Sequence, residues 1–218
     1  MDQPDPTTNN PRNLVLIGMP GCGKSSTGLL LAKSLCLDFL DTDLLIQKRE
    51  GMSLQRLIDW HGMDHFLRCE QAAILSIDPC SEQTVIATGG SVVLSEHAMQ
   101  HLRRLGLIIF LDVPLDKLQR RLRNIHTRGI AMKPGQSLAD VYRDRQPRYR
   151  AYADRTVQGG RGSLEKMVEF LIRRLQQEGF MPCQPEQLSQ HRQARPGRPG
   201  RETDAKPEQH ADTTRRSE

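Results

Sequence analysis

The chain has 218 residues, 37% of them hydrophobic, and a mean hydropathy of −0.56, which allows one ordinary soluble domain with its own core. Its longest apolar run, residues 105–113, contains Gly106 and Asp112 and is far too short to cross a bilayer, so we expect no membrane association. The net charge is +5 and the pI about 9.1, but the arginines are dispersed and only 4% of the residues are aromatic, which argues against nucleic acid as a partner.

Both ends of the chain are polar, and we expect both to be disordered. Residues 1–12 are rich in Pro, Asn and Thr and lack the apolar segment of a secretory signal, so the cytoplasm is the expected location. Residues 181–218 hold too few large apolar side chains to offset the entropy lost on ordering. An arginine-rich contact arm is the alternative for this tail. The five cysteines include no C-x-x-C pair, which favours free thiols in a reducing compartment.

Between these ends, residues 13–180 alternate short apolar runs with helical patterns and form one predicted domain. The predicted strands lie at 13–17, 38–41, 84–88, 107–112 and 155–158, and the predicted helices at 24–36, 53–78 with a break near Gly62, 96–105, 115–123, 138–153 and 163–178. Apolar strands that alternate with helices predict an α/β fold with a parallel sheet covered on both faces. Ligands in such folds bind beyond the carboxyl ends of the strands.

A glycine-rich loop follows the first predicted strand. Residues 18–25 read GMPGCGKS and fit the pattern G-x-x-x-x-G-K-[ST], with a strand before and a helix after. Gly18, Gly21 and Gly23 let backbone N–H groups curl around phosphate oxygens, and the helix N-terminus adds a partial positive charge. Lys24 can reach the β- and γ-phosphates, and Ser25 can offer its hydroxyl to Mg²⁺. The motif therefore predicts ATP and Mg²⁺ as cofactors.

Two further residues of this region are assigned to the nucleotide site, namely Cys22 within the loop and Ser26 just after it. The Cys22 thiol lies near a helix N-terminus, where a thiolate is favoured, so we expect Mg-ATP to slow its alkylation. A small residue at this place in the loop is all that packing would require.

The acidic stretch FLDTDLLI, residues 39–46, follows the first predicted helix. Asp41 and Asp43 are two residues apart, so on an extended strand their carboxylates point to the same side, beside the phosphates. One carboxylate can hold a metal-bound water and the other can face an acceptor hydroxyl. The alternative is that these residues only end a strand and cap a helix that starts near Leu44. No N-K-x-D segment of a GTPase is present, and a small-molecule kinase fits this chain length better than a motor.

At this point the sequence resembles the shikimate kinase family over residues 13–177. The resemblance rests on the phosphate loop, on residues 41–43 (DTD), on Phe66 and Glu70, on residues 87–90 (ATGG), on an arginine in a lid loop and on residues 145–150 (RQPRYR). It implies a P-loop NTPase three-layer fold with a short parallel sheet, a helical substrate-binding insertion at about 44–78 and a lid loop at about 124–136.

The resemblance also implies residue roles on the nucleotide side. Asp41 would support Mg²⁺ through water, and Arg121 would stack on adenine. Arg128 would be the lid arginine that covers the transferring phosphoryl group. Positioning and charge stabilisation, rather than covalent help, are what phosphoryl transfer requires, and Lys24, Mg²⁺ and the lid arginine would supply them.

On the acceptor side, the resemblance implies that Asp43 orients the acceptor hydroxyl, as a base or by contact. Gly89 and Gly90 would let the acceptor lie against backbone, and Arg145 would bind its carboxylate. The expected acceptor is therefore a small alcohol that carries a carboxylate.

The acceptor half departs from the family pattern F-R-x-x-E. Phe66 and Glu70 match, but Leu67 takes the place of the arginine, and Arg68 is one residue further, about 100° around the helix. In the family this arginine binds substrate and pairs with the glutamate. A charge-assisted hydrogen bond contributes roughly 1.5–3 kcal/mol, so its loss would weaken shikimate binding by about ten- to a hundredfold. Further departures are Met63 for a glutamate, Ser91 for the third glycine, and Gly129 for the proline after the lid arginine.

The altered acceptor half leads to a hypothesis about the substrate. A pocket that keeps Glu70 and Arg145 but lacks one arginine suits an acceptor with its own ammonium group, so homoserine, phosphorylated to O-phosphohomoserine, is the first expectation. Shikimate, phosphorylated to shikimate 3-phosphate, is the alternative, since Arg68 can shift into place. A nucleotide-binding regulator without catalysis is a further alternative. We expect a monomer.

Two histidines of the predicted insertion, His61 and His65, are four residues apart, a spacing that can suit a metal ion. The sequence offers no third ligand with a clear placement, so solvated helix faces are the expected environment of both side chains.

Overall fold

The structure is a computed structural model, and it describes residues 13–78, 83–122, 130–132, 135–160 and 162–180. All of them fall within one unit, Met1–Cys183, and the second unit, Gln184–Glu218, lies outside the described residues. The disorder expected for both ends, and most of the expected lid, therefore concern residues whose structure is not described.

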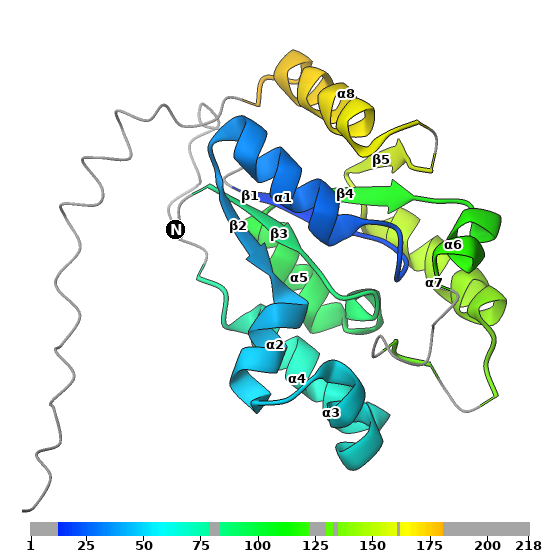
Figure 1. Ribbon diagram of the computed structural model, residues 1–218. Coiled ribbons are helices and arrows are strands. Elements are labelled where there is room, and N and C mark those ends of the chain that lie inside the picture. The colour runs from blue at the N-terminus through cyan, green and yellow to red at the C-terminus, as the bar shows by residue number, and fades with distance from the viewer. Residues whose placement is uncertain (1–12, 79–82, 123–129, 133–134, 161, 181–218) are drawn as a thin grey trace, which may run out of the picture. The chain divides into compact units, whose positions relative to one another are not determined.

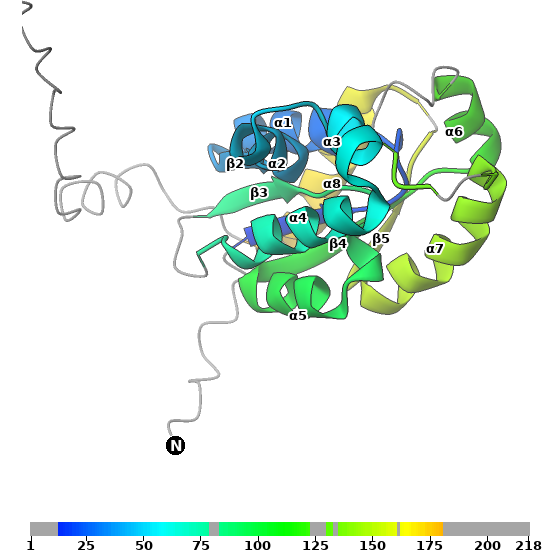
Figure 2. The ribbon, with the colours of Figure 1, turned by 90° about the horizontal axis from the view of Figure 1, so that it is seen from below.

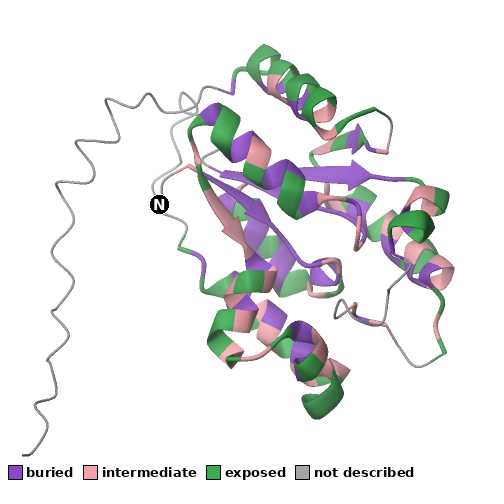
Figure 3. Ribbon diagram, in the orientation of Figure 1, coloured by how far each residue is buried: buried purple, intermediate pink, exposed green. Residues whose placement is uncertain are grey.

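The strands form one parallel sheet in the order β2-β3-β1-β4-β5. Their bounds are β1 Asn13–Ile17, β2 Asp38–Asp41, β3 Thr84–Ala87, β4 Gly106–Asp112 and β5 Arg155–Gln158. Every residue of β1 and β3 is buried, as apolar strands that are covered on both faces require. Figure 3 shows the central strands buried between helices whose outer faces are exposed, whereas the edge strand β2 is only partly buried.

The helices cover both faces of the sheet. Their bounds are α1 Lys24–Leu35, α2 Thr42–Glu50, α3 Leu54–His61, α4 Met63–Leu75, the 3₁₀ helix η1 Val92–Leu94, α5 Glu96–Leu105, α6 Leu115–Arg121, α7 Leu138–Tyr152 and α8 Leu164–Gln177. Figures 1 and 2 show α1 and α8 on one face and α5 and α7 on the other. The arrangement is the expected three-layer α/β fold.

The register of the sheet brings the carboxyl ends of four strands to one edge. Ile17 of β1 pairs with Phe110 of β4, and Asp41 of β2 pairs with Ala87 of β3. The loops that follow these strands therefore meet at the same edge, where ligands of parallel sheets bind. This register explains how residues far apart in the sequence build one site.

A second, smaller apolar cluster lies outside the main core. It is formed by α2, α3 and α4 together with Ala131, and its buried members are Ile46, Leu54, Leu57, Phe66, Ala73 and Ala131. Figure 1 shows these three helices as a group beyond the end of β2. The helical insertion expected at about 44–78 corresponds to this group, which packs around a cluster of its own.

The predicted elements agree with the structure except at a few places. The break expected near Gly62 is confirmed, since Gly62 has a φ of 81° and separates α3 from α4, but the helical region ends at Leu75 and not at 78. Two elements were not predicted: α2, which starts directly at Thr42, and the short η1. No helix among the described residues is long and apolar enough to cross a membrane.

Candidate functional site

The loop between β1 and α1 has the backbone of an anion cradle. Gly18, Gly21 and Gly23 have φ values of 144°, 75° and 102°, a region that other residues rarely adopt. A β-carbon at Gly21 would also meet Leu122 at 2.8 Å. The first turn of α1 has no capping side chain, so its amide hydrogens are available to an anion such as phosphate.

The basic and hydroxyl groups of the loop lie at the start of α1. Lys24 is buried, and its Nζ donates hydrogen bonds to the carbonyl oxygens of Gly18 at 2.8 Å and Met19 at 3.1 Å. Ser25 and Ser26 are exposed in the first turn of α1 and line the cavity described below. These groups therefore fit a nucleoside triphosphate, with Mg²⁺ on the Ser25 hydroxyl.

Cys22 takes a packing position in the loop. Its side chain is only 2% exposed, belongs to the main core, and has its Sγ 3.8 Å from Nζ of Lys24. We therefore expect slow alkylation of this thiol even without ATP, and the predicted protection by Mg-ATP stays a prediction. The exposed Cys36, at the end of α1, is the more accessible thiol.

Arg121, the last residue of α6, lies over the loop. Its NH1 donates to the carbonyl oxygens of Cys22 at 3.2 Å and Gly21 at 3.4 Å, and its side chain is exposed. The guanidinium thus lies beside the cradle, where it can face a bound nucleotide. Arg128 and Gly129 lie outside the described residues, so their predicted roles stay predictions.

The two aspartates after β2 do not share a strand, contrary to the sequence analysis. β2 ends at Asp41, whose Oδ1 accepts hydrogen bonds from the backbone N–H groups of Asp43 at 2.9 Å and Leu44 at 3.4 Å. Asp41 is thus the N-cap of α2, as the alternative interpretation had it, because an N-cap carboxylate satisfies free amide hydrogens of the first helical turn. Of the two, only Asp43 lines the cavity.

Asp43 is placed to act on a hydroxyl group. It lies partly buried in the first turn of α2. Burial raises the pKa of its carboxyl, the positive charge of Lys24 lowers it, and the charge of Asp41 raises it again, with a net increase. A raised pKa makes the carboxylate a better proton acceptor toward an alcohol.

Glu70 of α4 is the most deeply buried acid of the site. The pKa of its carboxyl is raised to about 7 in total. Burial is the largest cause and the charge of Asp43 adds to it, whereas Ser91, Arg145 and Lys24 lower the pKa in part. The buried Ser91 side chain lies beside this carboxylate. Oε1 of the carboxylate is buried and has no hydrogen-bond partner among the described residues.

The backbone after β3 forms one wall of the site. Gly89 accepts no β-carbon, because one would overlap Oε1 of Glu70 and lie 3.0 Å from Oδ1 of Asp43. Gly90 presents its carbonyl oxygen to two side chains of α7, Arg145 at 3.0 Å and the Tyr149 hydroxyl at 2.5 Å. Gly89 therefore brings backbone close to the two carboxylates, and the predicted role of Gly89 and Gly90 in letting the acceptor lie against backbone stays a prediction.

Arg145 is the cation on the acceptor side. It is 4% exposed, and it also donates a hydrogen bond to the carbonyl oxygen of Ala131. Its hydrogen-bond partners among the described residues are carbonyl oxygens, so no carboxylate of that part of the chain contacts the charge directly. An anionic group of a ligand is what such a guanidinium binds best.

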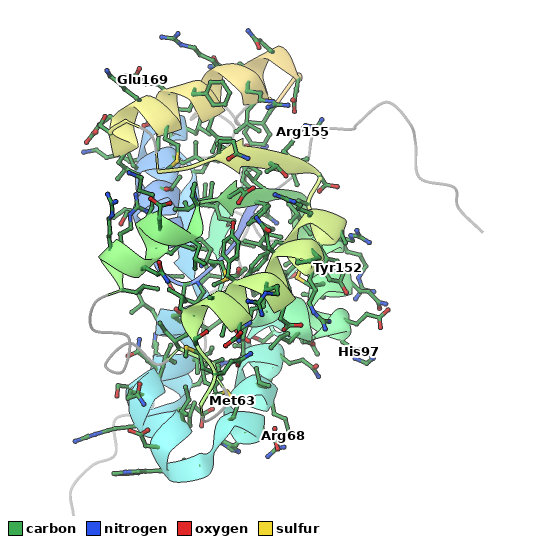
Figure 4. All side chains as sticks on the ribbon, turned by 90° about the vertical axis from the view of Figure 1, so that its right-hand side faces the viewer. Met63, Arg68, His97, Tyr152, Arg155 and Glu169 are labelled. Carbon is green, nitrogen blue, oxygen red and sulfur yellow. The ribbon has the colours of Figure 1, made fainter. Side chains whose placement is uncertain are left out.

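The residues that depart from the family pattern divide into two groups. Leu67 and Met63 are partly buried, pack against the cluster of the helical insertion, and do not line the cavity. Arg68 is exposed and points outward from α4 in Figure 4. Ser91, in contrast, is buried in the site itself, against Glu70.

One cavity of about 590 Å³ joins the phosphate cradle to these acceptor-side groups. Its lining includes Pro20, Gly21, Gly23, Lys24, Ser25, Ser26, Asp43, Phe66, Glu70, Thr88, Gly89, Gly90, Ser91, Arg121, Leu122, Ile130, Ala131 and Arg145. Of the predicted site residues that the structure describes, Gly18, Cys22, Asp41 and Leu67 do not line it. A donor and an acceptor can therefore meet in one space.

Sequence reasoning missed Asp112, the last residue of β4. Its buried carboxylate receives the side-chain amides of Gln146 at 3.4 Å and Gln158 at 3.2 Å, and it forms an ion pair with Arg150 at 3.3 Å. These contacts hold α7, which carries Arg145, against the sheet. The sequence did hold a signal for this role, because Asp112 is an acidic residue at the carboxyl end of an apolar strand.

Comparison with known proteins gives one consistent family. Residues 20–176 match the family model described as shikimate kinase. The shikimate kinase of Thiobacillus denitrificans is 37% identical over 165 residues, which cover 75% of this chain and 90% of that protein. The shikimate kinase of Caldanaerobacter subterraneus is 33% identical over 164 residues, which cover 74% and 95%.

Solved structures show the same fold. The shikimate kinase of Aquifex aeolicus superimposes with a TM-score of 0.66 at 28% identity and covers 77% of this chain and 98% of that one. The shikimate kinase of Acinetobacter baumannii, solved in complex with shikimate, gives a TM-score of 0.71 at 24% identity, with coverages of 78% and 95%.

Proposed function

This chain belongs to the shikimate kinase family and is a phosphotransferase, and we propose that it transfers the γ-phosphate of ATP, with Mg²⁺, to a hydroxyl group of a small carboxylate, with shikimate as the first candidate. The observation that carries this proposal is the single cavity that joins the phosphate cradle to Asp43 and Arg145. The names of the relatives favour shikimate over homoserine, which the sequence analysis had put first.

The donor half would bind ATP through groups that the chain already presents. The uncapped amide hydrogens of α1 face the cradle, and Lys24 Nζ can turn from the carbonyl oxygens of Gly18 and Met19 to phosphate oxygens. Mg²⁺, held through the Ser25 hydroxyl, would supply charge neutralisation on the phosphates. Arg121 would lie along the nucleotide.

The acceptor half would position the hydroxyl and exclude wrong substrates. Arg145 would bind the carboxylate of the acceptor, and Gly89 and Gly90 would let it lie against backbone. Asp43 would accept the hydroxyl proton as the phosphoryl group is transferred. Because the chemistry is mostly positioning, specificity would require an acceptor whose carboxylate reaches Arg145 while its hydroxyl lies at Asp43.

A second candidate, homoserine, is favoured by the surroundings of Glu70. Position 67 holds Leu, and no described side chain partners Oε1 of Glu70. Ser91, which stands at the third glycine of the family pattern, lies beside the carboxylate and lowers its pKa, but unlike an arginine it carries no positive charge. An ammonium group on the acceptor would supply the missing positive charge, and it would stabilise the ionised form of Glu70.

The test is a comparison of the two acceptors with the purified full-length chain. Phosphorylated product is measured by mass spectrometry, and initial rates with Mg-ATP give kcat/KM for shikimate and for homoserine. The proposal predicts stoichiometric shikimate phosphate with the higher kcat/KM. A higher kcat/KM for homoserine would establish the second candidate, and nucleotide binding without transfer to either would favour a regulator.

A paired variant sharpens this comparison. Leu67→Arg with Ser91→Gly restores the family pattern around Glu70, and Arg68→Ala is the matched control, since Arg68 is exposed. If the acceptor is shikimate, the double variant should raise kcat/KM for it by about tenfold or more through one added charge-assisted hydrogen bond. If the acceptor is homoserine, the added arginine should repel the ammonium group and lower kcat/KM, while Arg68→Ala changes neither.

A further inference from the structure

Three side chains with metal-binding atoms meet outside the kinase cavity. Glu50 is the last residue of α2, and His65 and Cys69 lie one turn apart on α4. Their ligand atoms all lie within 4.8 Å of one another, and all three residues are partly buried. None of them lines the kinase cavity. The sequence analysis paired His65 with His61, but the structure supplies Glu50 and Cys69 as further ligands to His65.

The spacing of these atoms suits a tetrahedral metal ion. Cys69 Sγ and His65 Nε2 are 3.4 Å apart. With zinc bonds of about 2.3 Å to sulfur and about 2.05 Å to nitrogen, two ligands of a tetrahedron lie ~3.6 Å apart. The pair on α4 is therefore already close to the distance that zinc needs. Their spacing of four residues places both on one helix face, and only Glu50 has to approach from α2.

The local chemistry is also that of a cation site. The Glu50 carboxylate lies beside the Cys69 sulfur, since the ligand atoms of Glu50, His65 and Cys69 are all within 4.8 Å of one another. A thiolate and an imidazole are ligands for zinc and similar transition metals, whereas Mg²⁺ prefers oxygen ligands alone. This cluster would therefore not compete for the magnesium of the phosphate site.

We propose that Glu50, His65 and Cys69 bind one Zn²⁺ ion, with water as the fourth ligand. Binding releases the thiol proton of Cys69 to solvent as the Zn–S bond forms. The ion would join the end of α2 to the middle of α4. These two helices carry Asp43 and Glu70, so zinc fixes the insertion from its outer side, about 10 Å along α2 from Asp43.

Zinc binding to the full-length chain tests the proposal. The protein is stripped of metal with a chelator, and zinc is titrated in competition with a colorimetric zinc indicator. The expected result is one tight equivalent in the wild-type chain and its loss in Cys69→Ser and in His65→Ala. The matched controls are Cys36→Ser and His97→Ala, because both residues are exposed and lie on other helices or their ends.

Alkylation of the unaltered chain gives a second readout that no folding defect can affect. Peptide mass spectrometry follows the labelling of Cys69 and Cys36 with and without zinc. Zinc should protect Cys69 and leave the rate at Cys36 unchanged. The proposal is overturned if the wild-type chain binds no tight equivalent, if Cys69→Ser binds zinc as Cys36→Ser does, or if zinc leaves Cys69 as reactive as before.

Discussion

The carboxylate of Glu70 lies against the backbone of Gly89, so closely that a β-carbon on that glycine would overlap Oε1. The same β-carbon would lie 3.0 Å from Oδ1 of Asp43. The side chains of two helices, α2 and α4, therefore approach one wall of the cavity at a position where only glycine fits. This contact places the ATGG motif, residues 87–90 at the end of β3, beside the two acidic side chains of the acceptor site.

Substituting Gly89 by alanine should therefore disrupt the acceptor site. The added methyl group displaces Glu70 or Asp43, and a misplacement of about 1 Å can lower kcat/KM by about 100-fold. The control is Gly51→Ala, where φ is 67° and nothing lies within 4 Å. That variant has backbone strain of about 1–3 kcal/mol but no collision, so it should lose stability and keep its rate. Equal kcat/KM for Gly89→Ala and the wild type would contradict the geometry.

The ionisation of Glu70 predicts a pH-dependent stability. Its pKa is about 7 in the folded chain and 4.5 as the ordinary value. Between pH 4.5 and pH 7, the Glu70 carboxyl is mostly protonated in the folded chain and mostly ionised in the unfolded chain. The free energy of unfolding therefore falls as pH rises from 4.5 to 7 and changes little through this group above that. The full effect is about 3 kcal/mol.

Glu70→Gln isolates this effect, because it keeps the shape of the side chain and removes the titration. Urea unfolding near pH 5 and near pH 8 gives the free energy of unfolding at both ends. The wild type should lose about 3 kcal/mol more than Glu70→Gln between these conditions. Parallel pH profiles for the two proteins would mean that Glu70 ionises normally in the folded chain.

Much of the fold was predictable because local patterns determined it. The bounds of β5 and α5 agree with those expected, and the break near Gly62 was expected from the glycine, whose φ in the structure is 81°. The favoured interpretation missed α2 because it kept Asp41 and Asp43 on one extended strand, and only the alternative placed a helix near Leu44. Its start depends on Asp41 accepting amide hydrogens, a contact that periodicity does not reveal.

The candidate site also has one part that the sequence predicts and one part that it does not. The phosphate loop is contiguous in sequence, so its geometry follows from one motif. The surroundings of Glu70 depend on contacts between residues 70, 89 and 91, which belong to different elements. That Leu67 packs into a separate apolar cluster, while Ser91 reaches Glu70, follows only from the packing of α4 against η1 and the neighbouring helices.

The Tyr149 hydroxyl should contribute to the position of Gly90. It donates to the Gly90 carbonyl oxygen at 2.5 Å, and its ring stacks on Phe110 with centroids 5.1 Å apart. Tyr149→Phe keeps the ring and removes one buried hydrogen bond, a loss of about 1 kcal/mol in the free energy of unfolding. Arg145 still satisfies that carbonyl, which limits the loss.

Tyr142→Phe is the matched control for this substitution. Tyr142 is one of the partly buried residues of α7, and its hydroxyl accepts from Gln146 at 2.7 Å without contacting the cavity wall. Both variants should lose some stability in thermal unfolding. Only Tyr149→Phe should raise KM for the acceptor, because only that hydroxyl holds backbone beside Arg145. A larger rise in KM for Tyr142→Phe would be the contrary result.

Asp41 caps α2 in the structure, and the family resemblance implies a second role for its carboxylate, the support of Mg²⁺ through water. As the N-cap of α2 it accepts from Asp43 and Leu44, and asparagine caps a helix about as well as aspartate. Asp41→Asn should therefore keep the melting temperature. Asp41→Ala should lower it by about 2–4 °C, which corresponds to about 1 kcal/mol for a chain of this size.

Activity then tests the support of Mg²⁺ that the family resemblance implies. If the charge of Asp41 holds a water of the metal ion, Asp41→Asn should raise the Mg²⁺ concentration needed for half-maximal rate, although its stability is unchanged. Rates are measured at saturating ATP over a range of Mg²⁺, with the wild type in parallel. If Asp41→Asn follows the wild-type Mg²⁺ curve while Asp41→Ala is only less stable, the carboxylate acts as a helix cap alone, and the metal depends on Ser25 and the phosphates.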